Sequence, residues 1–192
     1  VKRELLFSNA EIHDIAVALG VDPHDEKDDP DLSGLRYGKI ASMTDADVDG
    51  AHISVLLLTL FYRHFPKLIE KGHIYIACPP LYKVEVPGHG KRAAKKLYAL
   101  DEEELKSILD RARDDGIKRE SVSIQRFKGL GEMNPGQLWE TALNPDTRRL
   151  LKVRIEDRNQ TFKLFNMLMS KKEAEKRCEW MEEKGNTVEA DV

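Results

Sequence analysis

Three aspartates at alternate positions, Asp45, Asp47 and Asp49, lie in the segment MTDADVDGAHI at residues 43–53. Carboxylates this close together repel one another at neutral pH. A chain that concentrates negative charge in this way either binds a cation there or leaves the charge in solvent. The segment is therefore either a cation site or a solvated acidic turn.

A calcium EF-hand is the first alternative, because DADVDG has the spacing of the first half of its loop. Counted from Asp45, the twelfth position of such a loop should be a bidentate Glu. That position is Leu56, within an apolar stripe of helical spacing. The residues before Asp45 also favour a strand where an EF-hand requires a helix. The sequence therefore excludes an EF-hand.

The second alternative is a strand, residues 39–43, followed by an acidic turn and a helix. Alternate side chains at a strand end point the same way, and α/β sheets bind ligands at the carboxyl ends of their strands. We expect Asp45, Asp47 and Asp49 to converge there, where hard oxygen ligands suit Mg²⁺. A solvated turn with Asp49 as helix N-cap stays open for that residue. It is disfavoured for the other two, because alternating carboxylates on a buried strand end are costly without a cation.

Apolar spacing and turn residues predict the elements around the aspartates. The sequence predicts one continuous final helix and a long buried helix after the aspartates, kinked or restarted at Pro66. The predicted helices are 9–19, 53–72, 101–116, a short one after Asn134, and 159–184; the predicted strands are 39–43, 73–78, a hairpin of 82–86 with 96–100, 121–127 and 150–155. Strands alternating with helices indicate an α/β core with an α-rich tail.

The composition sets broad limits on the class of protein. The chain has 192 residues, 41% hydrophobic and 34% charged, which suits one large or two small packed domains. Its net charge of −3 does not decide for or against nucleic acid, because a basic patch can lie within an acidic total. Two cysteines far apart predict a reduced cytosolic protein. No apolar run is long enough to span a membrane, and the absence of an initiator Met at Val1 predicts a fragment.

Three long motifs resemble a known family. MTDADVDGAHI, LLLTLFYRHFPKLIEKGHIYIACPPLYK and QRFKGLGEMNPGQLWETALNP resemble the Toprim domain and tail of the B-type subunit of bacterial type IIA topoisomerases. The resemblance covers essentially the whole chain. The short segment after PPLYK and the ending EWMEEKGNTVEADV favour the topoisomerase IV (ParE) branch over the gyrase branch. MTDADVDG is the form typical of gyrase, whose B-type subunit stays the alternative.

The resemblance implies a fold and a division into parts. It implies an α/β, Toprim-type (Rossmann-like) parallel sheet core with an α-rich C-terminal tail. Residues 1–120 would form this core, with a hairpin and helix insertion and without its first strand. Residues 121–192 would form the tail, which completes the core and contacts DNA and the A-type subunit.

The resemblance also implies a function. It implies Mg²⁺-dependent cleavage and religation of double-stranded DNA during ATP-dependent decatenation and relaxation, an isomerase activity used in chromosome segregation at the cytoplasmic nucleoid. Asp45 and Asp47 match metal ligands, and Asp49 matches the third acid of the motif. The nucleophilic tyrosine belongs to an A-type partner in an A2B2 complex, so none of the five tyrosines here has that role. ATP would bind an N-terminal module upstream of this chain.

The chain departs from the family pattern in one respect. The family's strand with a Glu-Gly-Asp-Ser-Ala sequence, which supplies a metal ligand and candidate general acid or base, is absent, as is its Pro-Leu-Arg-Gly-Lys segment. We therefore assign no catalytic residue to this chain. We expect the 192 residues alone to be inactive.

Several basic residues match DNA-contact or cleavage-core positions of the family. His52 matches a DNA contact and begins a helix, a favourable phosphate site, although it could be a plain surface residue. Arg126 and Lys128 match positions near the cleavage core. The alternative for their segment is a simple strand-to-helix turn, with Gly129 and Gly131 at positive φ.

Two further residues have a match in the family. Arg177 matches a DNA contact, and its alternative is a solvated basic helix face. Glu11 falls where the family's quinolone pocket is formed, and its alternative is an ordinary acid in the first turn of a helix.

A different class of function is a non-catalytic, magnesium-dependent nucleic-acid-binding or assembly module with a Toprim-like core. The QRFKGLGEM segment favours the topoisomerase group over this alternative.

Overall fold

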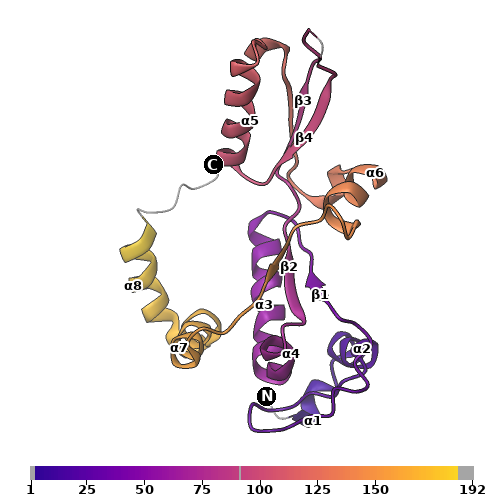
Figure 1. Ribbon diagram of the computed structural model, residues 1–192. Helices are drawn as coiled ribbons and strands as arrows, with labels where there is room; N and C mark the ends of the chain where they lie inside the picture. Colours follow the sequence, from indigo (N-terminus) through magenta and orange to yellow (C-terminus); the bar gives the residue numbers. More distant parts are fainter. Residues whose placement is uncertain (1–2, 91, 186–192) are drawn as a thin grey trace. The chain divides into compact units, whose positions relative to one another are not determined.

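The computed structural model describes residues 3–90 and 92–185 (Figure 1). The chain divides into two compact units, Val1–Val153 and Arg154–Val192. The first unit contains two small sheets with their helices, and the second is helical. The protein is therefore of mixed α/β class, as the sequence predicts.

The first sheet consists of β1 (Ile40–Ser42), β2 (Ile74–Ala77) and β6 (Leu150–Lys152), in the order β1-β2-β6. β1 pairs with β2 in parallel, and β2 pairs with β6 in antiparallel orientation. Within the described residues, the sheet has one parallel and one antiparallel pair, and the parallel core that the family resemblance implies is not confirmed. β1 lies at its edge.

Helices α3 (Val48–His64) and α4 (Pro66–Glu70) connect the parallel strands. Pro66 is the first residue of α4, where its missing N–H removes no helical hydrogen bond. The predicted break at Pro66 is therefore confirmed as the start of a new helix. Phe65 and Leu68 are fully buried at this junction and anchor it.

α3 is less buried than its apolar stripe predicts. Only Gly50 and Phe61 of this helix are buried. Ile53 is 49% exposed and Leu56 is 44% exposed. The prediction of a buried helix is therefore wrong for the side of α3 that carries these two residues.

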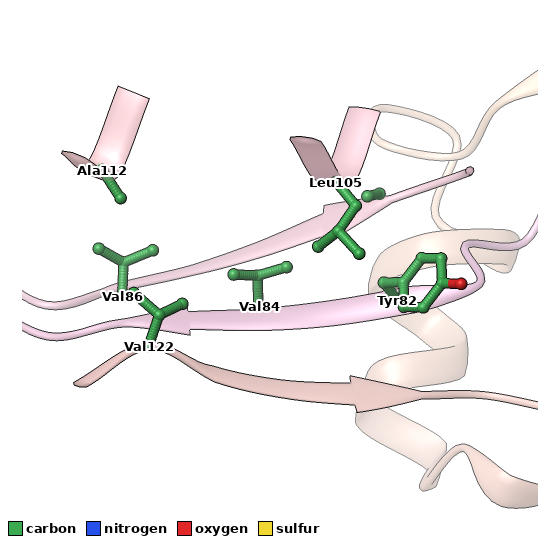
Figure 2. Packing of buried hydrophobic residues seen from close by; sticks show 7 residues of the cluster. Tyr82, Val84, Val86, Leu105, Ala112 and Val122 are labelled. Atoms are coloured by element: carbon green, nitrogen blue, oxygen red, sulfur yellow. The ribbon is translucent and has the colours of Figure 1, made fainter. Parts of the chain in front are cut away.

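The second sheet consists of β3 (Tyr82–Val86), β4 (Lys95–Ala99) and β5 (Ser123–Arg126), ordered β4-β3-β5 with antiparallel pairs throughout. The predicted hairpin is β3 with β4. Alternate β3 side chains face α5 (Glu102–Asp114) because strand side chains alternate between faces. Figure 2 shows the resulting core of Tyr82, Val84, Val86, Ala99, Leu105, Ala112 and Val122.

Helix ends follow the capping residues in the sequence. Asp101 Oδ1 accepts the Glu104 N–H at 2.8 Å and begins α5. The Glu104 carboxylate accepts the N–H of Leu100, the residue before the N-cap, at 3.0 Å. Asn134 and Gln137 form a reciprocal capping box at α6 (Pro135–Leu138), which continues into a π-helical turn at Trp139–Leu143.

The N-terminal part is helical. α1 (Arg3–Leu6) precedes α2 (Ala10–Leu19). Asn9 caps α2 by accepting the Ile12 N–H at 3.0 Å, and Gly20 ends the helix at φ 73°. The sequence prediction for this helix is confirmed.

The second unit contains α7 (Arg158–Met169) and α8 (Ala174–Lys184). An extended Ser170 and a 3₁₀ turn at Lys171–Glu173 separate them. The predicted single helix over 159–184 is therefore wrong, because Ser170 accepts the Lys172 N–H and ends the α-helical hydrogen bonding at that point.

The boundary between the two compact units lies between Val153 and Arg154. β5 and β6 pair with β3 and β2, so the chain through Val153 belongs to the first unit. A short 3₁₀ turn at Arg119–Ser121 leads into β5. Among residues 3–90 and 92–185, no helix is long and apolar enough to cross a membrane.

Candidate functional site

Asp45 and Asp47 lie in the turn between β1 and α3, Asp49 lies at the start of α3, and all three are exposed. Asp47 is the N-cap of α3, and its Oδ1 accepts the Gly50 N–H at 2.7 Å. Asp49 lies in the first turn of the helix. The alternative in which Asp49 is the N-cap is therefore wrong, because the helix begins two residues earlier.

Asp45 contacts a segment far along the chain. Its Oδ1 accepts the backbone N–H of Leu130 at 2.7 Å, across 85 residues of sequence. A Cβ at Gly129 would lie 3.0 Å from the Asp45 Cγ. Gly129 itself is extended, with φ −162°. The structure therefore brings the aspartate motif and the KGLGE segment together at Asp45.

The alternative in which Gly129 and Gly131 take positive φ is wrong. The residues that adopt positive φ among those described are Gly20, Gly72, Gly90 and Gly116. Gly129 is instead required by close approach, because any side chain there would press on the Asp45 carboxylate.

A second glycine approaches Asp45 from α3. A Cβ at the buried Gly50 would lie 2.1 Å from the main-chain oxygen of Asp45. Separations under 3.0 Å are essentially never seen for real Cβ atoms, so only glycine fits here. The backbone and the carboxylate of Asp45 are thus each packed against a glycine.

The described residues contain no group of three or more His, Cys, Asp or Glu side chains close enough to hold a metal ion. Asp45 and Asp47 each use Oδ1 for one main-chain N–H, and for neither is a hydrogen bond to Oδ2 found within the described part of the chain. Two carboxylates at a strand end fit Mg²⁺, because this cation keeps several waters and completes its shell with substrate phosphates. The two carboxylates therefore fit a cation site in which the protein supplies only some of the ligands.

The basic residues predicted near the site are exposed. His52 lies on α3 close to its N-terminus, and Arg126 is the last residue of β5. Lys128 directly precedes the glycine that packs on Asp45, and its N–H donates to Glu132 Oε2 at 2.8 Å. Lys128 is therefore held next to the aspartate turn by a segment distant in sequence, whereas His52 follows the turn directly on α3.

Arg177 has a role that neither sequence alternative predicts. Its Nη1 donates to the carbonyl oxygens of Met167 and Ser170, each at 2.7 Å. These carbonyls lie at the end of α7, where helical carbonyls lack partners, so the guanidinium ties α8 to α7. Glu11 is exposed in the first turn of α2.

A second polar cluster lines a cavity of about 380 Å³ beside β4. The Glu140 carboxylate accepts from Lys96 Nζ and from the Tyr98 hydroxyl, both at 3.0 Å. These bonds, that from Lys96 first, hold the pKa of Glu140 below its usual value, and the bond to Glu140 raises the pKa of Lys96. Burial is the main cause that raises the pKa of Tyr98. The cluster balances its own charge and packs the π-helical turn against the hairpin.

Sequence reasoning missed two contributions at the aspartate turn, the main-chain N–H of Leu130 and the close approach of Gly50. Main-chain donors leave no signal in side-chain types. Glycines at 50 and 129 are a signal of close packing, although they do not indicate which atoms approach.

Comparison with known proteins gives matches along the whole chain. The family described as DNA gyrase B subunit, carboxyl terminus, matches residues 119–182, from the start of the KGLGE-bearing region to α8. The B subunit of DNA topoisomerase 4 from Haemophilus influenzae is 47% identical over 196 aligned positions, which cover 100% of this chain and 29% of that protein.

Two further relatives show that the chain is similar to B subunits of both DNA topoisomerase 4 and DNA gyrase. The B subunit of DNA topoisomerase 4 from Pseudomonas aeruginosa is 49% identical over 96% of this chain and 28% of that protein. The B subunit of DNA gyrase from Thermotoga maritima is 47% identical over 85% of this chain and 24% of that protein. The chain spans less than a third of the length of these relatives. It therefore belongs to the family of B-type subunits of bacterial type IIA topoisomerases as a homologue of one portion of them, and its similarity extends along its whole length to topoisomerase IV members of that family.

Proposed function

We propose that this chain, within a complete B-type subunit, binds Mg²⁺ and double-stranded DNA and supports cleavage and religation by a tyrosine of an A-type partner. The reaction would serve ATP-dependent decatenation and relaxation. The observation that carries the proposal is the 2.7 Å hydrogen bond from Leu130 N–H to Asp45 Oδ1. It joins two of the three segments on which the family resemblance depends.

Asp45 and Asp47 would hold the cation, with Asp49 as an additional acid in the same turn. Bound Mg²⁺ stabilises negative charge that develops on phosphate oxygens during phosphoryl transfer. The chain fixes the two carboxylates beforehand, because the main-chain N–H groups of Leu130 and Gly50 each hold one oxygen. No residue of this chain supplies the nucleophile in the proposed reaction.

DNA would be bound through phosphate contacts from His52, Arg126, Lys128 and Arg177. Lys and Arg contacts to phosphates position a protein on the duplex and supply most of its salt-dependent affinity. A net charge of −3 is compatible with this, because a basic patch can lie within an acidic total. Loss of a cation ligand should therefore impair cleavage far more than DNA binding.

We further propose that a strand upstream of this chain pairs with the free edge of β1 and completes a Toprim-type core. β1 is an edge strand, and α3 leaves apolar side chains such as Ile53 exposed. The hydroxyl of Ser42, the last residue of β1, is buried without a hydrogen-bond partner among the described residues. Buried polar groups normally have partners. An added strand would also supply the glutamate that the family pattern includes.

Partner and inhibitor binding complete the proposal. The A-type subunit would assemble with the subunit that contains this chain as A2B2, and the tail over residues 121–192 would contact it. Glu11 would line the pocket for quinolone-type inhibitors.

The test is Asp45→Asn in the complete subunit, assembled with its A-type partner. Cleavage of supercoiled plasmid in Mg²⁺, trapped by a quinolone, should fall by about 100-fold or more, because a neutral amide ligates Mg²⁺ poorly. DNA affinity should change less than about threefold. Asp114→Asn, an exposed aspartate of α5, is the matched control and should cleave normally.

Equal loss of DNA binding and cleavage in Asp45→Asn would contradict the proposed cation role. Cleavage by the 192-residue chain alone would contradict the assignment of the nucleophile to the A-type subunit.

A further inference from the structure

The segment from Lys128 to Glu132 wraps the Asp45 carboxylate from a distant part of the chain. We propose that this turn is a positioning element that sets the Asp45 carboxylate for cation binding. Leu130 orients the carboxylate, Gly129 makes room for it, and Glu132 closes the turn. The identity of the cation as Mg²⁺ rests on the proposed function, whereas the positioning contact rests on the structure.

Leu130 orients Asp45 through its main chain. Its N–H donates to Oδ1 at 2.7 Å, a short bond of the kind made to ionised carboxylates. The bond selects one orientation of an exposed side chain that would otherwise exchange among several rotamers. Ligands fixed in this way lose less conformational entropy when a cation binds, and such outer partners tune metal affinity.

Gly129 determines how closely the turn approaches. A Cβ at this position would lie 3.0 Å from Asp45 Cγ, 3.1 Å from Oδ1 and 3.2 Å from Oδ2. All three distances are shorter than ordinary contacts, so an alanine would displace the carboxylate by a few tenths of an ångström. The aspartate side chain is exposed and can move, so the change acts on its position rather than on folding.

Glu132 keeps the turn closed. Its Oε2 accepts the Lys128 N–H at 2.8 Å, and its own N–H donates to the Gly129 carbonyl at 3.2 Å. These two bonds surround Gly129 and Leu130. The side chain of Glu132 therefore acts on Asp45 through the backbone of the turn.

Buried residues on both sides anchor the turn to the fold. Phe127 is 2% exposed, and its N–H donates to the Leu81 carbonyl at 2.8 Å. Met133, after the turn, is also buried. Because both ends are fixed, the Leu130 N–H has a defined position, and Asp45 is the side chain that adapts to it.

The same turn provides a matched control. A Cβ at Gly131 would meet nothing within 4 Å, and Gly131 is not at positive φ. Gly131→Ala should therefore leave the carboxylate in place, whereas Gly129→Ala should displace it. For Glu132, the Gln variant retains an acceptor oxygen for the Lys128 N–H and the Ala variant does not.

Cation binding is measured with Mn²⁺ by electron paramagnetic resonance on the complete subunit, counting only the Mn²⁺ that Asp45→Ala removes. Gly129→Ala should weaken this binding by about 10-fold or more, in the range typical of lost outer-shell partners. Glu132→Ala should weaken it as well. Gly131→Ala and Glu132→Gln should remain within about twofold of wild type.

The hydrogen bond is measured separately by hydrogen–deuterium exchange at the Leu130 amide. Asp45→Ala should increase the exchange rate by about 10-fold or more, because the amide loses its acceptor. Asp45→Asn retains an Oδ1 acceptor and should preserve most of the protection, although it loses the charge that binds a cation. If Asp45 had a purely structural role, Asp45→Asn would retain Mn²⁺ binding as well as the protection of the Leu130 amide.

Different results would contradict the positioning role and the proposed function. If Gly129→Ala binds Mn²⁺ as Gly131→Ala does, or if Asp45→Ala leaves Leu130 exchange unchanged, the positioning role is overturned even if the assembled enzyme cleaves DNA. If both measurements match the expectation and the wild-type complex does not cleave DNA, the positioning role stands and the proposed function fails.

Discussion

Gly50→Ala should destabilise the fold through a clash between two backbones. The added Cβ would lie 2.1 Å from the Asp45 carbonyl oxygen, against 3.4 Å for an ordinary contact. The carbon must also approach the Asp45 carbonyl carbon to 2.9 Å. No rotamer change relieves either contact, so the aspartate turn and the first turn of α3 must separate by about 1 Å.

The expected change in the free energy of unfolding of Gly50→Ala follows from two opposing effects. Overpacking of a close-packed site costs about 1–3 kcal/mol, and the upper part of that range applies because backbone must move. Alanine recovers up to about 1 kcal/mol as the better helix former. We expect a net loss of about 2 kcal/mol in the free energy of unfolding, which for a chain of this size lowers Tm by about 4–8 °C.

Urea unfolding of the chain followed by circular dichroism measures this loss. Gly136→Ala is the matched control, because it also lies in the first turn of a helix and its Cβ would meet Asn134 Oδ1 at an ordinary 3.5 Å. The control should unfold at or slightly above the wild-type midpoint. If Gly50→Ala unfolds with the control, the close approach of α3 to Asp45 is absent from the native state.

Two further predictions concern contacts away from the aspartate turn. The Leu100 N–H, and then Arg149, lower the folded pKa of Glu104 from 4.5, so its contribution to stability is present above pH 4.5 and is lost as pH falls through the lower folded pKa. Glu104→Gln should therefore flatten the fall in stability below that pH, measured by urea unfolding across the acid range, and a slope as steep as in the exposed control Glu103→Gln would contradict this. Arg177→Lys keeps the charge but loses the fixed Nη1 bonds to Met167 and Ser170, so amide exchange over 167–173 should increase while the salt dependence of DNA binding stays unchanged. Unchanged exchange would show that Arg177 does not join α7 to α8.

Local signals in the sequence predict the elements of this protein well. Asn9, Asp101 and Asn134 each cap the helix that the sequence assigns to them, because a side-chain oxygen one position before a helix satisfies its unpaired N–H groups. Pro66 begins α4 because its ring is compatible only with a first-turn position. The strands of the hairpin follow from alternation of buried and polar residues.

The sequence predictions that are wrong concern segments whose local pattern is compatible with more than one structure. The stripe over 159–184 continues through Ser170, and only the hydrogen bonds around that residue show two helices instead of one. α3 has the apolar stripe of a buried helix, yet Ile53 and Leu56 are exposed in this chain. An apolar stripe indicates which side of a helix tends to be buried, but it does not indicate which element buries that side.

Asp45 illustrates what the spacing of aspartates at alternate positions in the sequence can and cannot predict. The spacing of Asp45 and Asp47 after a strand indicates the turn and its chemistry, but three carboxylates do not form a closed group in the described part of the chain. Instead, separate main-chain donors hold Asp45 and Asp47: Leu130 comes from 85 residues away, and Gly50 comes from the helix that Asp47 caps. The two glycines that pack on Asp45 approach its backbone and its carboxylate respectively. The position of this carboxylate is therefore a property of the tertiary structure, and substitutions at Gly50 and Gly129 should alter cation binding with different costs in stability, large for the first and small for the second.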